Sequence, residues 1–228
     1  MAAAVAATAG LSVLLLEKRN LPRHKTCGGG MPMVVADHIR DLAPEAFVES
    51  DVQFMRHSFQ FKDPHVGAMN LQDNEKSYSL WMVQRSIFDN ALSQRAVQCG
   101  ATLQEGGTLR SISLEPSIIE LQIVNSSTLS TITTDFVIGA DGANGITSRL
   151  ISLRKNRTLA IALEVEHPYQ WELGHPILRR DICHLEYGAV PRGYAWVFPK
   201  GDHLNVGAGV FRPRKTGKGD AAVAGELR

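Results

Sequence analysis

An apolar run that ends in a glycine-rich turn constrains the fold of this chain most. Phe136-Val137-Ile138 leads into Gly139-Ala140-Asp141-Gly142, and a short helix is expected before Arg149. A buried strand followed by such a turn lets the backbone approach a pyrophosphate, and it holds Asp141 at the carboxyl edge of a sheet, where open α/β sheets bind ligands. An ordinary strand–turn–helix corner has the same pattern. The run therefore predicts an α/β fold, with a nucleotide site as the functional interpretation.

The start of the chain carries a second, weaker sign of the same fold. Residues Met1–Ala9 are alanine-rich and predict a helix, Gly10 ends it, and Leu11–Leu16 predicts a buried strand closed by Glu17. In a dinucleotide-binding βαβ unit, an acid at this position accepts hydrogen bonds from ribose hydroxyls about 20 residues after a GxGxxG turn. We therefore expect the first strand and its glycine turn to precede Met1. The alternative is a surface strand that happens to end in Glu.

Composition excludes several other classes of protein. The chain has 228 residues, 44% of them apolar, and its 24 basic and 23 acidic side chains give a net charge of +1, without the basic excess of a nucleic-acid binder. Cys27, Cys99 and Cys183 form no CxxC pair, and the eight histidines show no metal-ligand spacing, so we expect neither disulfides nor a metal. The uncharged first 16 residues lack the basic region of a signal peptide and are short for a membrane span. These features predict a cytoplasmic protein, with any membrane contact peripheral.

A loop and a helix carry further candidate residues. Pro22 and the run Cys27-Gly28-Gly29-Gly30 predict a loop whose backbone could approach a flat ligand. The alternative is a flexible surface loop, in which a Cys flanked by basic residues and glycines is less common. A helix is expected to begin at an S-x-x-D cap, Ser86 to Asp89, and to end at Gly100, with Cys99 in the core. Arg85 stands just before it, and its fork suits a phosphate, but it could equally be solvated.

The rest of the chain predicts β-structure. Strands are expected within residues 47–61, 66–71, 78–83, 109–114, 118–124 and 130–138. Near the end, Tyr194, Trp196 and Phe198 alternate, so their rings project from one face of a strand. That face is either an ordinary aromatic core or a hydrophobic wall for an apolar substrate.

Three motifs, in order along the chain, resemble the geranylgeranyl reductase family of FAD-dependent oxidoreductases. They are GLSVLLLEKRNLPRHKTCGGG at residues 10–30, the ADG…R turn at residues 140–149, and GYAWVFPKGDHLNVG at residues 193–207. The second departs from the usual pattern because Gly145 replaces a frequent Ser. The resemblance runs to about residue 212 and implies a chain truncated at both ends.

The resemblance implies a fold and a set of site residues. The fold is α/β, with an incomplete, doubly wound (Rossmann-like) FAD-binding domain at 1–50 and 84–152, an antiparallel β-sheet substrate domain at 51–83 and 153–212, and a frayed tail at 213–228. Tyr194, Trp196 and Phe198 would contact the isoprenoid substrate, and Cys27 would be the catalytic proton donor. The residues implied to contact FAD are Glu17, Lys18, Cys27, Gly28, Gly29, Arg85, Ala140, Asp141, Gly142 and Arg149.

The implied activity is saturation of isoprenoid double bonds, as in chlorophyll biosynthesis, by hydride from a reduced flavin. NADPH or ferredoxin would supply the electrons. An unperturbed thiol holds its proton at pH 7, which suits the role given to Cys27. Two alternatives stay open. One is an FAD-dependent aromatic hydroxylase, and the other is an incomplete remnant that is catalytically inactive, because it lacks the glycine turn that holds the pyrophosphate.

Overall fold

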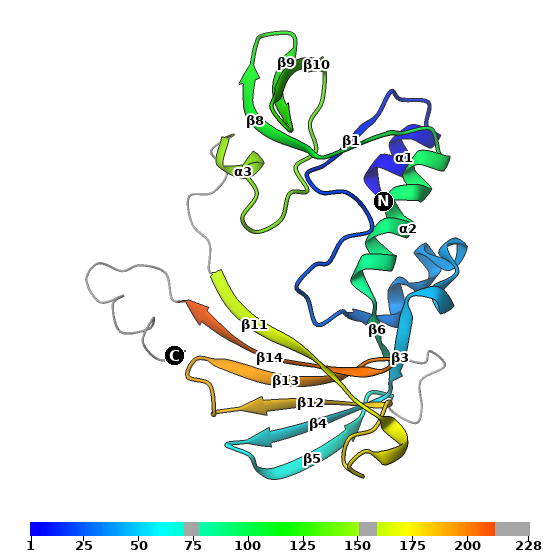
Figure 1. Cartoon of the computed structure of the whole chain (residues 1–228), viewed down its shortest axis with the longest axis vertical. Helices are drawn as coiled ribbons and strands as arrows, with labels where there is room; N and C mark the ends of the chain where they lie inside the picture. The colour runs from blue at the N-terminus through cyan, green and yellow to red at the C-terminus, as the bar shows by residue number, and fades with distance from the viewer. Residues whose placement is uncertain (71–77, 151–158, 213–228) are drawn as a thin grey trace, which may run out of the picture. The chain divides into compact units, whose positions relative to one another are not determined.

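The computed structural model describes residues 1–70, 78–150 and 159–212, and the chain divides into two compact units (Figure 1). Unit 1 comprises Met1–Glu49 and Leu80–Lys155, and unit 2 comprises Ser50–Ser79 and Asn156–Arg228. FAD binding by one unit and substrate binding by the other remain predictions. The expected frayed tail, residues 213–228, and the end of the expected strand at Leu71 lie outside the described residues. None of the described helices is both long and apolar enough to cross a membrane.

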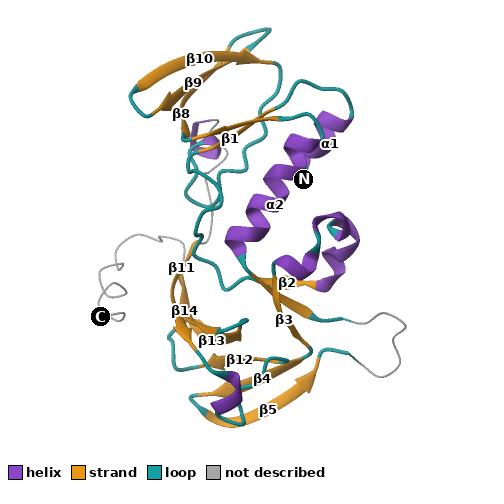
Figure 2. Ribbon diagram, turned by 45° about the vertical axis from the view of Figure 1, so that its right-hand side comes forward, coloured by secondary structure: helices purple, strands orange, loops and turns teal. Residues whose placement is uncertain are grey.

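Unit 1 begins with two helices packed against a small parallel sheet. Helix α1 (Ala2–Thr8) lies beside α2 (Arg85–Gln98), as Figure 2 shows, and strand β1 (Leu14–Glu17) pairs in parallel with β7 (Thr102–Glu105). Small side chains let the helices approach closely, and the buried alanines at positions 4, 96 and 101 form their core, against which Cys99 also packs. The alternation of helix and parallel strand confirms the predicted α/β class, although β1 is shorter than expected because Leu11 and Ser12 are exposed.

A second core in unit 1 lies against a sheet of three short strands. They are β2 (Gly30–Pro32), β6 (Leu80–Val83) and β3 (Val48–Val52), in the order β2-β6-β3. Between β2 and β3 the chain forms three short 3₁₀ helices, η1 (Met33–His38), η2 (Arg40–Leu42) and η3 (Pro44–Ala46). The Phe47 ring packs 4.9 Å from that of Phe88 on α2. The helix that carries Arg85 is therefore fixed to the segment that follows the glycine loop.

The start of α2 differs from the expected cap. Gln84 is the N-cap residue, without a side-chain cap bond, and Arg85 is the first helical residue. No side-chain cap bond forms at the start of the helix, and the Asp89 carboxylate instead accepts hydrogen bonds from two arginines. The predicted S-x-x-D capping box is therefore wrong, because both oxygens of the Asp89 carboxylate are engaged by guanidinium groups. The helix end is as predicted, with Gly100 in a left-handed conformation at φ 102°.

A three-stranded antiparallel sheet follows in unit 1, in the order β10-β9-β8. Its strands are β8 (Gly107–Leu114), β9 (Ile119–Asn125) and β10 (Thr128–Thr134). The expected strand to Ile138 is wrong, because β10 ends where Thr134 pairs with Ile119 at the end of β9. Beyond it, Phe136 is 85% exposed and Ile138 72% exposed. A strand needs a neighbour for its backbone groups, and the described residues supply none to this segment.

The glycine-rich turn after this segment is held by the Asp141 carboxylate. Its Oδ2 accepts hydrogen bonds from the backbone N–H of Thr147 at 2.8 Å and from the Thr147 hydroxyl at 3.0 Å, where α3 (Thr147–Leu150) begins. Burial alone would raise the pKa of Asp141, but these bonds favour the ionised form and hold its pKa below the ordinary value. A Cβ at Gly145 would lie 2.1 Å from Asp141 Cγ, so this arrangement requires glycine where the resembling family often has Ser.

Unit 2 is built on a six-stranded sheet in the order β11-β14-β13-β12-β4-β5. Its strands are β4 (Phe54–Phe59), β5 (Lys62–Ala68), β11 (Leu159–Pro168), β12 (Ile182–Tyr187), β13 (Gly193–Pro199) and β14 (His203–Arg212), with the short 3₁₀ helix η4 (Trp171–Leu173) after β11. All pairings are antiparallel except the parallel pairing of β12 with β4. The predicted antiparallel substrate sheet is thus a mixed sheet with one parallel pair.

Close backbone approach makes Gly193 the most sensitive glycine of this sheet. A Cβ there would lie 1.9 Å from the carbonyl oxygen of Gly209, which belongs to the main chain and cannot move without opening β14. We expect Gly193→Ala to lower the free energy of unfolding by about 1–3 kcal/mol, measured by urea denaturation with tryptophan fluorescence. Gly67→Ala on the edge strand β5 is the matched control, because nothing lies within 4 Å of its Cβ position. Equal stability of both variants would contradict the close approach.

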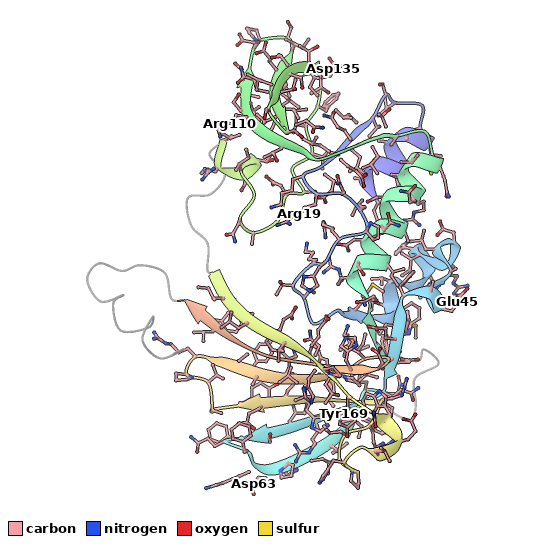
Figure 3. The ribbon with its side chains drawn as sticks, in the orientation of Figure 1. Arg19, Glu45, Asp63, Arg110, Asp135 and Tyr169 are labelled. Carbon is pink, nitrogen blue, oxygen red and sulfur yellow. The ribbon has the colours of Figure 1, made fainter. Side chains whose placement is uncertain are left out.

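The Asp141 turn predicts a pH-dependent contribution to stability. Because its pKa is lower in the folded chain, the contribution is complete above the unfolded value of about 3.9 and is lost as pH falls through the folded value. We expect Asp141→Asn to reduce the free energy of unfolding at pH 7 by less than about 1 kcal/mol, since the carboxylate is largely exposed, and this difference to shrink at an acidic pH below the unfolded value of about 3.9. Urea titrations at both pH values test this, with the exposed Asp135→Asn as control (Figure 3). A difference that persists in acid would refute the mechanism.

Candidate functional site

The carboxylate of Glu17 lies at the end of β1 and is already bound by its own chain. Its Oε1 accepts a hydrogen bond from the backbone N–H of Arg19 at 3.0 Å, and Oε2 accepts one from the Arg23 guanidinium at 3.1 Å (Arg19 is labelled in Figure 3). On the paired strand, Glu105 Oε1 accepts a bond from the backbone N–H of Leu21 at 2.8 Å. Two carboxylates at neighbouring strand ends therefore fix the start of the loop that leads to Cys27. A carboxylate has about four acceptor positions, so Glu17 can still accept a bond from a ligand hydroxyl.

One carboxylate, that of Asp89, joins the loop to helix α2. Its Oδ2 accepts hydrogen bonds from Arg23 Nη1 at 3.0 Å and Arg85 Nη2 at 3.1 Å, and Oδ1 accepts one from Arg85 Nε at 2.9 Å. The Asp89 side chain is only 13% exposed. Burial opposes the charge of Arg85, but its bonds to Asp89 outweigh that cost and raise its pKa. Glu17, Arg23, Asp89 and Arg85 thus form an ion-pair chain of two cations and two anions, which we call the four-residue chain.

The predicted catalytic loop ends beside this chain. The Cys27 thiol lies within hydrogen-bonding reach of the Arg85 guanidinium. Gly29 adopts a left-handed conformation at φ 77°, and its carbonyl accepts a bond from the backbone N–H of Val83 at 2.9 Å, which ties the loop to β6. Sequence separation hides this proximity, but the structure brings Glu17, Cys27 and Arg85, three of the predicted cofactor residues, into one neighbourhood of unit 1. Their role toward FAD remains a prediction.

Of the remaining predicted cofactor residues, Gly28 lies in the same loop as Cys27, Lys18 adjoins Glu17, and the others lie at the glycine-rich turn of unit 1. Lys18 is exposed next to Glu17, and Ala140, Gly142 and Arg149 are exposed around the Asp141 turn. Strand β8 contacts both β1 and α3, so the two motifs adjoin one strand. Since the Asp141 carboxylate is engaged by Thr147, a ligand at this turn would meet mainly backbone and exposed polar groups. A common FAD crevice for Glu17 and Asp141 remains a prediction.

The aromatic face predicted in the last third is present in unit 2. Tyr194, Trp196 and Phe198 of β13 form a row, with ring centroids 5.8 and 6.0 Å apart. The row continues onto β12 and β4, because Tyr187 lies 6.4 Å from Tyr194 and 5.8 Å from His57. The alternation in the sequence therefore correctly predicted a shared face, and its role as a substrate wall stays a prediction.

Trp196 is the most enclosed ring of this row. It is 8% exposed, and its indole N–H donates a 2.8 Å hydrogen bond to Oδ1 of the fully buried Asn205. Its ring lies over β14, where a Cβ at Gly207 would come within 2.2 Å of it. Tyr194 and Phe198 are only partly buried. Trp196 therefore behaves as a core residue of the sheet, whereas its two neighbours keep surface that another molecule could cover.

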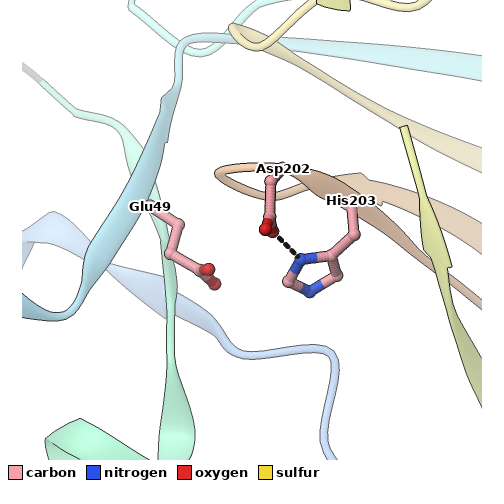
Figure 4. A group of neighbouring side chains, drawn as sticks. All are labelled: Glu49, Asp202 and His203. Carbon is pink, nitrogen blue, oxygen red and sulfur yellow. Dashed lines mark hydrogen bonds and ion pairs between the residues drawn. The ribbon is translucent and has the colours of Figure 1, made fainter. Parts of the chain in front are cut away.

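The turn between β13 and β14 carries a histidine–carboxylate pair. Nδ1 of His203 lies 2.8 Å from Oδ1 of the preceding residue, Asp202 (Figure 4). The hydrogen bond with His203 lowers the pKa of Asp202. The pair belongs to the PKGDH part of the third motif, whose turn is closed by a 2.9 Å hydrogen bond from the backbone N–H of Lys200 to the carbonyl oxygen of His203.

Two residues of the site were not predicted from the sequence. Arg23 had been grouped with the basic residues of a loop, and Asp89 had been assigned to a helix cap. The spacing of Arg85 and Asp89, four residues apart on one helix face, is a signal that could have indicated an ion pair. The contact of Asp89 with Arg23, 66 residues earlier in the chain, has no counterpart in local sequence.

FAD is the group that this neighbourhood would have to fit, and the donor and acceptor set is compatible with it. Glu17 keeps acceptor capacity for ribose hydroxyls, and Arg85 uses Nε and Nη2 for Asp89, which leaves Nη1 for a thiol or an anion. The loop glycines allow close approach of the main chain. The two carboxylates balance the two guanidinium groups, so the added charge of the pyrophosphate would have to be met by groups outside the four-residue chain.

Comparisons with known proteins agree with this assignment. The FAD binding domain family matches residues 1–166. Geranylgeranyl diphosphate reductase of Synechocystis is 30% identical over 229 residues, covering 94% of this chain and 53% of the relative. Digeranylgeranylglycerophospholipid reductase of Methanothrix thermoacetophila is 27% identical, covering 94% and 54%. The chain therefore spans about half the length of these curated relatives.

Solved structures share the fold. A geranylgeranyl bacteriochlorophyll reductase-like protein of Thermoplasma acidophilum superposes with a TM-score of 0.78 at 25% identity, over 92% of this chain and 53% of the other. The halogenase PltM, solved with phloroglucinol and FAD, has a TM-score of 0.66 at 16% identity, over 99% of this chain and 52% of the other, a likeness of fold alone. The predicted fold class and family resemblance are confirmed: the chain belongs to the FAD binding domain family, with relatives named as geranylgeranyl reductases.

Proposed function

We propose that this chain is the FAD-binding and substrate-facing part of an oxidoreductase that saturates double bonds of geranylgeranyl chains. The observation that carries the proposal is the ion-pair chain in unit 1 that links Glu17 to Arg85, with the Cys27 thiol beside Arg85. These residues come from the first and second halves of the FAD-binding sequence and would serve one ligand. The names of the relatives support the geranylgeranyl chain as the substrate class.

Different polar groups of unit 1 would contact different parts of FAD. Glu17 would accept hydrogen bonds from the ribose hydroxyls, and the free edge of Arg85 would face an anionic or carbonyl group of the cofactor. Gly28 and Gly29 would let the main chain lie against the flavin. When bound and reduced, the flavin supplies the hydride that adds to one carbon of the double bond.

Cys27 would supply the proton for the other carbon. An isolated alkene accepts hydride poorly, so protonation of the neighbouring carbon has to accompany hydride addition. In the balanced reaction, one hydride and one proton convert a C=C bond to a C–C single bond, and water later returns a proton to the thiolate. Arg85 beside the thiol would stabilise the thiolate left after proton transfer.

Unit 2 would contribute an apolar wall. Tyr194 and Phe198 present partly exposed rings on either side of Trp196, and rigid rings bury large area at low entropic cost. The relatives' names include both a diphosphate and a glycerophospholipid, so the proposal is limited to the shared geranylgeranyl chain. NADPH or ferredoxin would reduce the flavin.

The first test is FAD binding by residues 1–228, followed by quenching of flavin fluorescence. A charge-assisted hydrogen bond contributes roughly 1.5–3 kcal/mol, so we expect Glu17→Gln to raise the Kd for FAD about tenfold to a hundredfold. Glu45→Gln, at an exposed carboxylate on η3 (labelled in Figure 3), removes the same charge away from the four-residue chain and should leave the Kd within twofold. Equal affinity of the Glu17→Gln variant and the parent would contradict the ribose role.

The second test is reduction itself. Dithionite-reduced FAD is mixed with the chain and geranylgeranyl diphosphate, and mass spectrometry detects the gain of two hydrogens for each double bond saturated. We expect Cys27→Ala to lower the rate at least a hundredfold, the usual scale for a positioned proton donor. Cys99→Ala is the control, because Cys99 packs in the α1–α2 core.

Each outcome separates the alternatives. An unchanged rate in Cys27→Ala would remove Cys27 from the mechanism while leaving the reductase intact. Absence of FAD binding, or FAD binding without any saturated product, would favour the inactive remnant. A product that requires oxygen and carries a new hydroxyl would favour the aromatic hydroxylase.

A further inference from the structure

The four-residue chain contains two side chains to which the proposed function gives no task, Arg23 and Asp89. Both are substantially buried, with 20% and 13% of the side chain exposed. Neither was expected at the site from the sequence. Within the described part of the chain, however, the ion pairs of both side chains are with residues that would touch FAD, or with each other.

Asp89 determines how the Arg85 guanidinium is oriented. Its two oxygens accept bonds from Nε and Nη2 of Arg85, 2.9 and 3.1 Å long, so the planar fork is held along one edge. A guanidinium held along one edge can present only the opposite edge to a ligand. Asp89 therefore leaves the Nη1 group and the outer N–H of Nη2 as the donors that Arg85 can present.

Arg23 does the same for Glu17. Its Nη2 donates to Glu17 Oε2 at 3.1 Å, while Nη1 donates to Asp89 Oδ2 at 3.0 Å. One planar group thus spans two carboxylates that belong to different elements, the end of β1 and the first turn of α2. A lysine has a single ammonium in place of this fork and could not span both carboxylates with the same geometry.

We propose that Arg23 and Asp89 are positioning residues, which lock the Glu17 carboxylate and the Arg85 guanidinium into one fixed arrangement for FAD. This inference rests on the proposed function. The order of contacts, Glu17–Arg23–Asp89–Arg85, means that each end residue is oriented through a middle one. Loss of either middle residue releases an end residue without removing its charge.

The first experiment follows the Arg85 side chain in FAD-free residues 1–228 by arginine Nε–Hε NMR, with the signal assigned through Arg85→Lys. We expect a slowly exchanging signal in the parent, and at least tenfold faster hydrogen exchange in Asp89→Asn. Asp41→Asn is the matched control, because Asp41 pairs with Arg95 of the same helix outside the four-residue chain. The Arg85 signal should be the same in that control as in the parent. An Arg85 signal unchanged in Asp89→Asn would overturn the proposal.

The second experiment measures the Kd for FAD. We expect a rise of at least tenfold in both Asp89→Asn and Arg23→Gln, a similar rise in Arg23→Lys, and no change beyond twofold in Asp41→Asn. The double variant Arg23→Gln/Asp89→Asn should bind within threefold of the weaker single variant, because both changes break one chain of contacts. Multiplying effects, or full rescue by Arg23→Lys, would overturn the positioning role and leave a simple effect of charge.

Folding and the proposed function are tested separately from the inference. If Asp89→Asn does not fold, Arg23→Gln decides the outcome, because Arg23 lies in a loop outside the helices and strands of unit 1. A parent that does not bind FAD refutes the proposed function and the positioning role together. A parent that binds FAD, with variants that bind it equally well, refutes the positioning role alone.

Discussion

The organisation of unit 1 around its predicted site depends on the carboxylate of Asp89. Two guanidinium groups donate three hydrogen bonds to it at 2.9–3.1 Å, in surroundings where only 13% of the side chain is exposed. Burying one such charge without partners would cost several kcal/mol. Each charged side chain of the four-residue chain therefore offsets the cost of burying its oppositely charged neighbours. Removing one partner leaves an uncompensated charge, whereas the complete set is neutral. That neutrality allows a loop with few backbone hydrogen bonds of its own to hold Cys27 in one place.

Local patterns predicted the elements well, and they failed where a partner came from far along the chain. The periodic apolar residues of α2 and its terminal Gly100 were sufficient to place the helix, because those signals lie within one stretch of sequence. The same stretch suggested that Asp89 caps the helix, since Ser86 and Asp89 have the spacing of a capping box. In the structure, the Asp89 carboxylate instead accepts a hydrogen bond from Arg23. Both carboxylate oxygens are engaged by guanidinium groups, and no local pattern contains the contact with a residue 66 positions away.

The segment at Phe136–Ile138 failed for the complementary reason. Its apolar composition is typical of a buried strand, but composition describes what a segment could bury and not which neighbour it has. Within the described residues, β10 ends at Thr134, and the following side chains are exposed. The turn itself was predictable in position but not in detail. Asp141 turns back to Thr147, and this explains why Gly145 stands where the related motif often has Ser, since a side chain there would overlap the carboxylate.

In the aromatic face of unit 2, one ring belongs to the core of the sheet, whereas its two neighbours along the strand lie partly at the surface. Alternation alone treats Tyr194, Trp196 and Phe198 as equivalent, because all three have the same parity along β13. Contacts distinguish them. Trp196 lies over the side-chain-free Gly207 and donates to the buried Asn205, so its ring is part of the sheet, and any change there would disturb β14 as well. The rings of Tyr194 and Phe198 are partly exposed. Substitutions at such positions can fit the length or shape of an apolar ligand while the sheet stays intact. Specificity for a prenyl chain would therefore be adjusted at Tyr194 and Phe198, and Trp196 would remain the fixed support between them.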